Sequence, residues 1–303
     1  MEQKFGKQTA RLVLFEMIRT FLFGFLYVYG HATDIDFSKT VPGYFDIDPL
    51  LPFEFPSKYG DDDGSRIVGG MESIPNSRPY QAAVYIFFNA THGSFCGGSL
   101  INPMTILTAA HCVDNTSLNL TIVLGAHSLP SNPANTTHIS TGDIVLHPNW
   151  TRSTLMNDIA IVRLPSPVEL SDRINTVLLP RDDSHDYLGN TTLVSGWGRP
   201  ADTVGTISPV LREVSSFVIS QHACNLAYLG MIDPSHICIS GAYGRGTCNG
   251  DSGGPLVVNG VQIGVVSFGI TYGCEVGWPP VFARVTSYLD WIAQNSANVT
   301  AYY

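Results

Sequence analysis

The chain has 303 residues, of which 44% are hydrophobic and 14% charged, with 29 glycines and 19 prolines. This composition is typical of a globular protein and excludes a disordered chain, a coiled coil and collagen. The formal net charge is −9, and residues 67–303 contain 9 arginines, no lysine and 15 acidic residues, with no basic cluster. Because nucleic-acid binding depends on basic surfaces that displace counterions, we expect no nucleic-acid partner.

The N-terminal residues 1–32 have the features of a signal peptide. Arg19 provides a basic flank, an apolar run follows it, and the sequence Gly-His-Ala at 30–32 puts small residues at the cleavage positions. The run is far shorter than the ~20 residues that a membrane-spanning helix needs, so we expect secretion to the extracellular space and no membrane anchor. A chain that starts at Met17 would have a compact basic n-region, and residues 1–16 would then be an upstream extension.

Residues 33–66 differ in composition from the rest of the chain, with eight acidic residues, three basic residues and four prolines. The prolines prevent a long helix, and the acidic run at 61–63, followed by Gly64, predicts a solvated, flexible segment. A plain linker and an acidic pro-segment that is removed by cleavage after Arg66 both fit this pattern. The residues that follow Arg66 decide between them.

Seven sequons for N-glycosylation support secretion independently. A single match to this short pattern carries little weight, whereas seven in one chain predict that some of them are glycosylated. The acceptors are Asn89, Asn115, Asn119, Asn135, Asn149, Asn190 and Asn298.

From residue 67 onward, short strands predominate. Runs of β-branched or aromatic residues separated by turn residues predict strands over 81–88, 105–109, 119–124, 159–164, 193–195, 255–258 and 262–268. Only residues 287–297 have helical spacing, with Tyr288, Trp291 and Ile292 on one face. The pattern predicts an all-β fold in one block of ~240 residues.

Four short motifs in this block carry chemistry. They are Ile-Val-Gly-Gly at 67–70, Thr-Ala-Ala-His-Cys at 108–112, Asn-Asp-Ile-Ala at 157–160 and Gly-Asp-Ser-Gly-Gly-Pro at 250–255. The third motif is weak by itself and the fourth is highly specific. Together they closely resemble the chymotrypsin/trypsin family of serine endopeptidases. The resemblance implies two packed antiparallel six-stranded β-barrels with a C-terminal helix, in a protease domain over 67–303.

The resemblance assigns the catalytic roles to His111, Asp158 and Ser252. A serine hydroxyl is a poor nucleophile until a base takes its proton, and an imidazole titrates near working pH. In this family, the reference case for the triad, the aspartate holds the imidazole in the correct tautomer and stabilises the imidazolium that forms. The backbone N–H groups of Gly250 and Ser252 are implied to form the oxyanion hole.

The order of these residues excludes a rival hydrolase fold. Residues 250–254 also match Gly-x-Ser-x-Gly, the nucleophile elbow of α/β-hydrolases, in which the histidine follows the serine. Here no histidine follows Ser252.

The chain also has no His-Glu-x-x-His motif, no paired Cys-x-x-Cys motif and no acidic residue between Asp114 and Asp143 to serve a calcium loop. We therefore expect neither a metal nor a cofactor.

All six cysteines lie after residue 67, and an even number in a secreted chain predicts three disulfides, although counting alone leaves their connectivity open. The family resemblance implies the pairs Cys96–Cys112, Cys224–Cys238 and Cys248–Cys274. The first pair would brace His111, and the third would join the serine loop to the wall of the substrate pocket. The segment 33–66 has no cysteine, so nothing covalent would hold it after cleavage.

The sequence after Arg66 favours a pro-segment over a linker. In the family, cleavage of the activation bond frees the α-amine of an isoleucine, which pairs with the aspartate before the catalytic serine. The resemblance transfers these roles to Ile67 and Asp251. Because a buried carboxylate needs a partner charge, we expect this ion pair to order the oxyanion loop only after cleavage.

The resemblance places the substrate pocket at Gly246, Thr247, Asn249, Ser267, Phe268, Gly269 and Pro280. An aspartate at the pocket base would select Lys or Arg, but Gly246 has no charge, so we expect a separate trypsin-like protease to cut at Arg66. The Ser-Phe-Gly sequence at 267–269 would pair with the substrate backbone. Gly269 leaves the pocket mouth open to large apolar or aromatic side chains, whereas Pro280 stands where glycine is usual and would narrow the pocket.

We therefore expect a monomeric, secreted digestive endopeptidase, made as a zymogen and cleaving protein substrates after large hydrophobic or aromatic residues. Residues 259–264 and 267–291 resemble arthropod chymotrypsins most closely. Elastase-like or broad collagenolytic specificity and a regulatory cascade protease remain alternatives, and protein protease inhibitors are expected partners. A non-catalytic homologue that acts as a binding module is disfavoured, because all the catalytic and activation residues are present.

Overall fold

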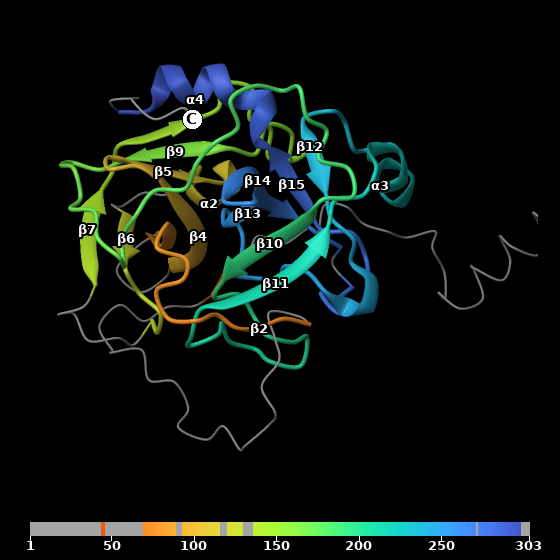
Figure 1. Ribbon diagram of the computed structural model, residues 1–303, viewed down its shortest axis with the longest axis horizontal. Coiled ribbons are helices and arrows are strands. Elements are labelled where there is room, and N and C mark those ends of the chain that lie inside the picture. Colours follow the sequence, from red (N-terminus) through yellow and green to blue (C-terminus); the bar gives the residue numbers. More distant parts are fainter. Residues whose placement is uncertain are drawn as a thin grey trace, which may run out of the picture. The chain divides into compact units, whose positions relative to one another are not determined.

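The computed structural model describes residues 44–45, 69–88, 93–115, 120–129, 136–270 and 272–297 (Figure 1). The expected signal peptide, most of the expected pro-segment, and Arg66 and Ile67 lie outside these residues. Among the described residues, no helix has both the length and the hydropathy needed to cross a bilayer.

The first sheet is antiparallel and contains eight strands in the order β7-β6-β3-β4-β5-β9-β8, with β1 paired to β4 beside this path. Its strands are β1 (Tyr44–Phe45), β3 (Gln81–Phe87), β4 (Gly93–Asn102), β5 (Thr105–Thr108), β6 (Leu120–Leu124), β7 (Thr137–Thr141), β8 (Ile144–Leu146) and β9 (Ala160–Arg163). The strand β5 pairs only with the second half of β4. The edge of the first half that β5 leaves uncovered pairs with β1 at Gly93 and Ser94.

The second sheet is antiparallel and contains seven strands in the order β12-β15-β14-β13-β10-β11-β2. They are β2 (Met71–Glu72), β10 (Thr191–Gly196), β11 (Arg212–Phe217), β12 (His236–Cys238), β13 (Pro255–Val258), β14 (Val261–Phe268) and β15 (Val281–Arg284). The two antiparallel sheets confirm the expected fold class. The strand counts exceed six because short edge pairings, such as the two-residue β1 and β2, extend the sheets.

The helices are short and lie between or after the strands. They are α2 (Ala110–Val113), α3 (Gln221–Ala227), η3 (Ala242–Gly244), η4 (Val285–Tyr288) and α4 (Leu289–Asn295). The terminal helix was expected, and Tyr288, Trp291 and Ile292 do pack against the core. The helix α3 was not expected, because only one of its residues, Cys224, is buried and the sequence therefore shows no apolar stripe. Its start is fixed by Ser220, whose hydroxyl accepts the N–H of Ala223 at 3.1 Å.

The two sheets share buried surface, which sets the position of the site. The main hydrophobic cluster contains residues of the first sheet together with Val257, Val265 and Ala283 of the second sheet. Strand β4 is buried along its whole length although its sequence, Gly-Ser-Phe-Cys-Gly-Gly-Ser-Leu-Ile-Asn, does not resemble a typical strand. Its glycines permit close contact: a Cβ on Gly97 would lie 3.0 Å from Cα of Gly254. Figure 1 shows the two sheets next to each other.

Candidate active site

His111 lies in α2, directly after β5. The strand β5 pairs with β4 on one side and with β9 on the other. The Cys96–Cys112 disulfide joins α2 to β4 from the next residue along the helix. His111 is only 4% exposed, and the two small alanines before it are fully buried. The imidazole is therefore anchored by a helix that is itself fixed to the sheet.

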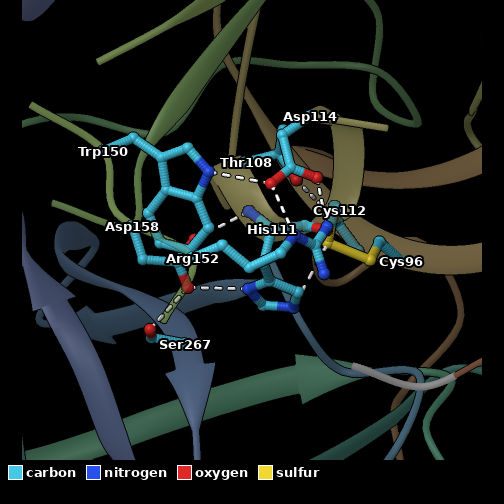
Figure 2. Close-up of polar contacts among 10 residues, drawn as sticks. Cys96, Thr108, His111, Cys112, Asp114, Trp150, Arg152, Asp158 and Ser267 are labelled. Carbon is cyan, nitrogen blue, oxygen red and sulfur yellow. Dashed lines mark hydrogen bonds and ion pairs between the residues drawn. A yellow bond between two sulfur atoms is a disulfide. The ribbon is translucent and has the colours of Figure 1, made fainter. Parts of the chain in front are cut away.

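Asp158 precedes β9, and its carboxylate binds His111 twice. Its Oδ2 lies 2.6 Å from Nδ1 of His111, and its Oδ1 accepts the backbone N–H of His111 at 2.9 Å. The hydroxyl of Ser267 in β14 donates to Oδ2 at 2.5 Å, and Figure 2 shows Asp158 between these two partners. Burial alone would raise the pKa of Asp158, but the charge of His111 and these hydrogen bonds outweigh it and hold the pKa below its ordinary value. The carboxylate is therefore ionised and fixes the orientation of the imidazole.

Ser252 lies in a tight loop before β13, and the backbone conformation of this loop requires glycine at positions 250 and 253. Gly250 and Gly253 have φ values of 98° and 78°. A Cβ on Gly253 would lie 2.2 Å from Oγ1 of Thr108 and 2.5 Å from the carbonyl oxygen of Gly97. That close approach lets the N–H of Gly97 donate to the carbonyl of Ser252 at 2.7 Å. The loop is thereby tied to β4, the same strand that is linked to α2.

Ser252 and His111 line the same pocket, but the structure forms no hydrogen bond between the side chains of these two described residues. Nε2 of His111 lies 3.7 Å from Sγ of Cys112 instead. Contacts between a nucleophile and its base often tighten only when substrate binds. The structure thus brings all three residues together, with the contact between His111 and Asp158 already formed.

The carboxylate of Asp251 is completely buried next to the serine loop. Its Oδ1 accepts the N–H of Gly198 at 2.8 Å, and its Oδ2 accepts the N–H of Cys248 at 2.9 Å. Burial raises the pKa of Asp251 to about 6, although these two hydrogen bonds act in the opposite direction. No cationic side chain among the described residues forms an ion pair with it. Ile67, the expected source of a partner charge, lies outside the described residues.

Two backbone N–H groups on either side of Asp251 are available to a ligand. Within the described part of the chain, the N–H groups of Gly250 and Ser252 donate to no protein acceptor. The other N–H groups of the loop are used, since Asp251 donates to Cys248 and Gly253 donates to Val266. A pair of fixed, unpaired donors next to a nucleophile can stabilise an oxyanion.

A charged network outside the expected site residues holds α2 to the loop that precedes Asp158. Asp114, at the end of α2, accepts the indole N–H of Trp150 and the Nε–H of Arg152, each at 2.8 Å. Arg152 also forms an ion pair with Oδ1 of Asp114 and donates to the carbonyl of His111 at 3.1 Å. Figure 2 shows Trp150 and Arg152 on the carboxylate of Asp114. No sequence pattern indicated this network, because it joins residues that are distant in the chain.

A pocket of about 340 Å³ opens next to Ser252 and His111. Of the expected pocket residues, all except Gly246 line it: Thr247, Asn249, Ser267, Phe268, Gly269 and Pro280. Gly246 is buried directly behind Pro280, and a Cβ on Gly246 would lie 2.8 Å from Cγ of the proline ring. The proline therefore separates the expected pocket base from the cavity.

Sequence reasoning missed several further lining residues: Leu155, Arg199, Asp202, Ile270, Tyr272 and Trp278. Asp202 joins two loops at the pocket, because its carboxylate accepts the N–H groups of Cys274 at 2.7 Å and Glu275 at 3.1 Å. The guanidinium of Arg199 is likewise engaged by the carbonyl oxygens of Val204 and Asp202. Both charged groups are thus held by backbone atoms rather than directed at a buried pocket base.

An aromatic group supports one wall of the pocket. The ring of Tyr228, at the end of α3, packs edge-on against Phe268 and Trp278, with centroid distances of 5.6 and 6.3 Å. The hydroxyl of Tyr228 donates to the carbonyl of Pro279 at 2.7 Å, and burial raises the pKa of this tyrosine. The wall is therefore apolar and is fixed next to Pro280.

The structure joins the cysteines as Cys96–Cys112, Cys224–Cys238 and Cys248–Cys274, the pairs that the resemblance implies. Three of the seven sequon asparagines are described, and all three are exposed: Asn115, Asn149 and Asn190. The other four lie outside the described residues: Asn89, Asn119, Asn135 and Asn298.

Comparison with known proteins is consistent across three approaches. The family model described as Trypsin matches residues 67–292. Brachyurin of Leptuca pugilator is 46% identical over 234 residues, which are 77% of this chain and 100% of the relative. Chymotrypsin of Phaedon cochleariae is 38% identical over 78% of this chain and 84% of its own length. The solved structure of HL collagenase has a TM-score of 0.70 and 35% identity, covering 77% of this chain and 100% of that one.

Proposed function

Because the chain belongs to the trypsin family of serine proteases, we propose that Ser252, His111 and Asp158 are the residues with which it hydrolyses peptide bonds. The observation that carries this proposal is the buried pair of His111 and Asp158, joined at 2.6 Å, in which His111 lines the same pocket as Ser252. A buried imidazole held by an ionised carboxylate is prepared to accept a proton from a neighbouring hydroxyl.

The reaction follows from this arrangement. His111 Nε2 takes the hydroxyl proton while Ser252 Oγ attacks the substrate carbonyl, and Asp158 stabilises the imidazolium that forms. The N–H groups of Gly250 and Ser252 bind the resulting oxyanion. One such donor typically lowers the activation free energy by roughly 3–4 kcal/mol. The imidazolium then protonates the leaving amine, and water hydrolyses the acyl ester on Ser252.

The proposed activation step depends on the buried carboxylate of Asp251. Its raised pKa means that ionisation is less favourable than for an ordinary aspartate while no cation pairs with it. Cleavage after Arg66 would supply the α-amine of Ile67 as that cation and stabilise the loop that carries Gly250 and Ser252. We expect Ile67→Gly and Asp251→Asn to be cut normally at Arg66 by trypsin yet to have little activity. Full activity of either variant would contradict this mechanism.

The proposed specificity is for large hydrophobic or aromatic side chains before the scissile bond. Its support is the apolar wall of Phe268 and Trp278, the absence of a side chain at Gly269 and the lack of a charge at Gly246. A broader, collagenolytic specificity is the second candidate, favoured by the structural similarity to a collagenase. Pro280 at the pocket also favours it, because a proline there restricts the depth available to an aromatic side chain.

We further propose that residues 1–32 are removed during secretion, that residues 33–66 form the pro-segment, and that 67–303 act as an extracellular, monomeric enzyme. The exposed Asn115, Asn149 and Asn190 are the proposed glycosylation sites among the described residues. A separate trypsin-like protease is the proposed activator, since Gly246 has no charge and the carboxylate of Asp202 at the pocket already accepts two backbone N–H groups.

The test is to express the whole chain, activate it with immobilised trypsin and remove the trypsin. Peptide amides with Phe, Leu, Ala or Arg before the scissile bond, and native triple-helical collagen, would then serve as substrates. We expect the Phe and Leu peptides to be cleaved fastest and the Ser252→Ala protein to be inactive on all of them. A preference for Arg in the wild type would contradict the specificity, and activity of Ser252→Ala would contradict the mechanism.

A further inference from the structure

The loop between Cys238 and Cys248 has an exposed tyrosine at its tip. Tyr243, in the one-turn 3-10 helix η3, is 93% exposed, more than any other large hydrophobic side chain among the described residues. Its φ of 64° and ψ of 26° lie in the left-handed region, which is unfavourable for a residue with a side chain. Exposed loop tips of this kind are the preferred sites of proteolytic cleavage.

Both ends of this loop are anchored to the substrate pocket. A Cβ on Gly241 would lie 2.1 Å from the carbonyl oxygen of Trp278, and Gly246 packs against the ring of Pro280. The next residues, Thr247 and Asn249, line the pocket. Cleavage at the tip would therefore remove one of the covalent attachments that hold the pocket wall in place.

The disulfides do not bridge the tip. Cys96–Cys112 and Cys224–Cys238 lie entirely before Tyr243, and Cys248–Cys274 lies entirely after it. A cut after Tyr243 would thus divide the enzyme into 67–243, with His111 and Asp158, and 244–303, with Ser252. No covalent bond would connect the two pieces.

We propose that the Tyr243–Gly244 bond is an autolysis site, at which one molecule of the active enzyme cleaves another and ends its activity. The proposal rests on the proposed specificity, because an aromatic side chain precedes the bond. Ser252 Oγ of the attacking molecule would form an ester with the Tyr243 carbonyl carbon as the bond to the Gly244 nitrogen breaks. His111 would protonate that nitrogen, and water would release the Tyr243 carboxylate.

A second exposed loop provides a matched comparison. Leu229, after α3, is 72% exposed and has a φ of 52°. It lies between Cys224 and Cys238, so a cut there leaves the two pieces joined by that disulfide. Cleavage at Leu229 is therefore expected to add the mass of one water to the intact molecule, to release separate fragments only after reduction, and to affect activity little.

The experiment starts from the whole chain after activation and removal of trypsin. The wild type, Tyr243→Gly and Leu229→Gly are incubated at several concentrations, and activity on a Phe peptide and intact mass without reduction are followed together. We expect a fragment 244–303 to appear in the wild type at a rate that rises with the square of the enzyme concentration, as activity falls. Tyr243→Gly should start with unchanged activity and lose it at least about fivefold more slowly than the wild type. Leu229→Gly should lose activity at the wild-type rate.

Inactive Ser252→Ala protein, cut at Arg66 and mixed with a trace of wild type, tests the same bond without self-inactivation of the target. Fragment 244–303 from this protein supports the proposal. Suppose that the wild type cleaves the Phe peptide. The proposal is then overturned if fragment 244–303 does not form, or if Tyr243→Gly loses activity at the wild-type rate. If the wild type cleaves Arg peptides instead and produces fragment 246–303, the proposed specificity fails and the assignment to Tyr243 fails with it.

Discussion

The contact between Arg152 and Asp114 shows how single residues outside the proposed triad hold His111. Arg152 binds the carboxylate at the end of α2 and also donates to the carbonyl of His111. The side chain of Asp114 is only 9% exposed, so these donors and Trp150 supply hydrogen bonds that water would otherwise make to its carboxylate. A carboxylate left with fewer donors in such a position is costly.

We therefore expect Arg152→Met to lower the free energy of unfolding by roughly 1–3 kcal/mol and to reduce kcat/KM. The double variant Arg152→Met/Asp114→Leu should recover part of the stability, because it removes the unpaired charge as well. Urea unfolding and peptide kinetics measure the two effects. Arg173→Met, at an exposed arginine, is the control and should change stability by less than about 0.5 kcal/mol. Equal losses in Arg152→Met and Arg173→Met would contradict the prediction.

The contact between Gly246 and Pro280 predicts the outcome of a specificity exchange. A side chain at position 246 would meet the proline ring at 2.8 Å, and a ring cannot rotate away as a flexible side chain does. We expect Gly246→Asp alone to lose activity on Phe peptides without gaining activity on Arg peptides. The double variant Gly246→Asp/Pro280→Gly should gain cleavage after Arg. Efficient cleavage after Arg by the single variant would show that the ring does not obstruct the pocket base.

At the scale of elements, the Cys96–Cys112 disulfide connects α2 to β4 across 16 residues, whereas Cys224–Cys238 closes a similar span of 14 residues at α3. Loops of these lengths predict that loss of either disulfide costs roughly 3 kcal/mol of stability. Only the first one holds the helix that carries His111. The two are therefore a matched pair that separates stability from catalysis.

We expect Cys96→Ala/Cys112→Ala and Cys224→Ala/Cys238→Ala to show similar losses of stability in urea. The first double variant should also have a clearly lower kcat, measured under conditions in which both remain folded. The second should keep kcat near that of the wild type. A reversed order of the kcat values would mean that the first disulfide does not position His111.

The elements that sequence patterns predicted are those whose buried faces use ordinary strand residues. Strand β13 begins and ends where it was predicted, and β3, β5, β6, β9, β10 and β14 differ only at their ends. Strand β4 was missed because its glycines, needed for the close approach to Gly254, replace the usual β-branched residues. The helix α3 was missed because it is fixed by a cap and a disulfide rather than by an apolar face.

On the scale of the whole molecule, the buried Asp251 makes stability depend on pH. Its folded pKa of about 6 lies above the ordinary value of 3.8, so the folded state binds more protons than the unfolded state between these values. The free energy of unfolding of the uncleaved chain should therefore decrease by an amount on the order of 3 kcal/mol as pH rises from about 4 to about 6. It should stay at the lower value above about pH 6.

Thermal unfolding from pH 4 to pH 8 tests this expectation. Asp251→Asn removes the titrating group, so the difference in Tm between this variant and the uncleaved wild type should grow as pH rises through 6. After cleavage at Arg66, the proposed pairing with the Ile67 amine should reduce that difference at pH 7. A Tm difference that does not change with pH would contradict the assignment to Asp251.

The sequence by itself determined the family, the class of reaction and the identity of the proposed triad, because the family's motifs are short and contiguous. It also determined the all-β fold class, since β-branched runs and turn residues act locally. Only the tertiary structure decided that Pro280 covers Gly246, that Asp114 and Arg152 meet across 38 positions, and that Tyr243 stands exposed at the tip of the loop between Cys238 and Cys248. These features depend on contacts between segments that are far apart in the chain, and no local pattern encodes such contacts.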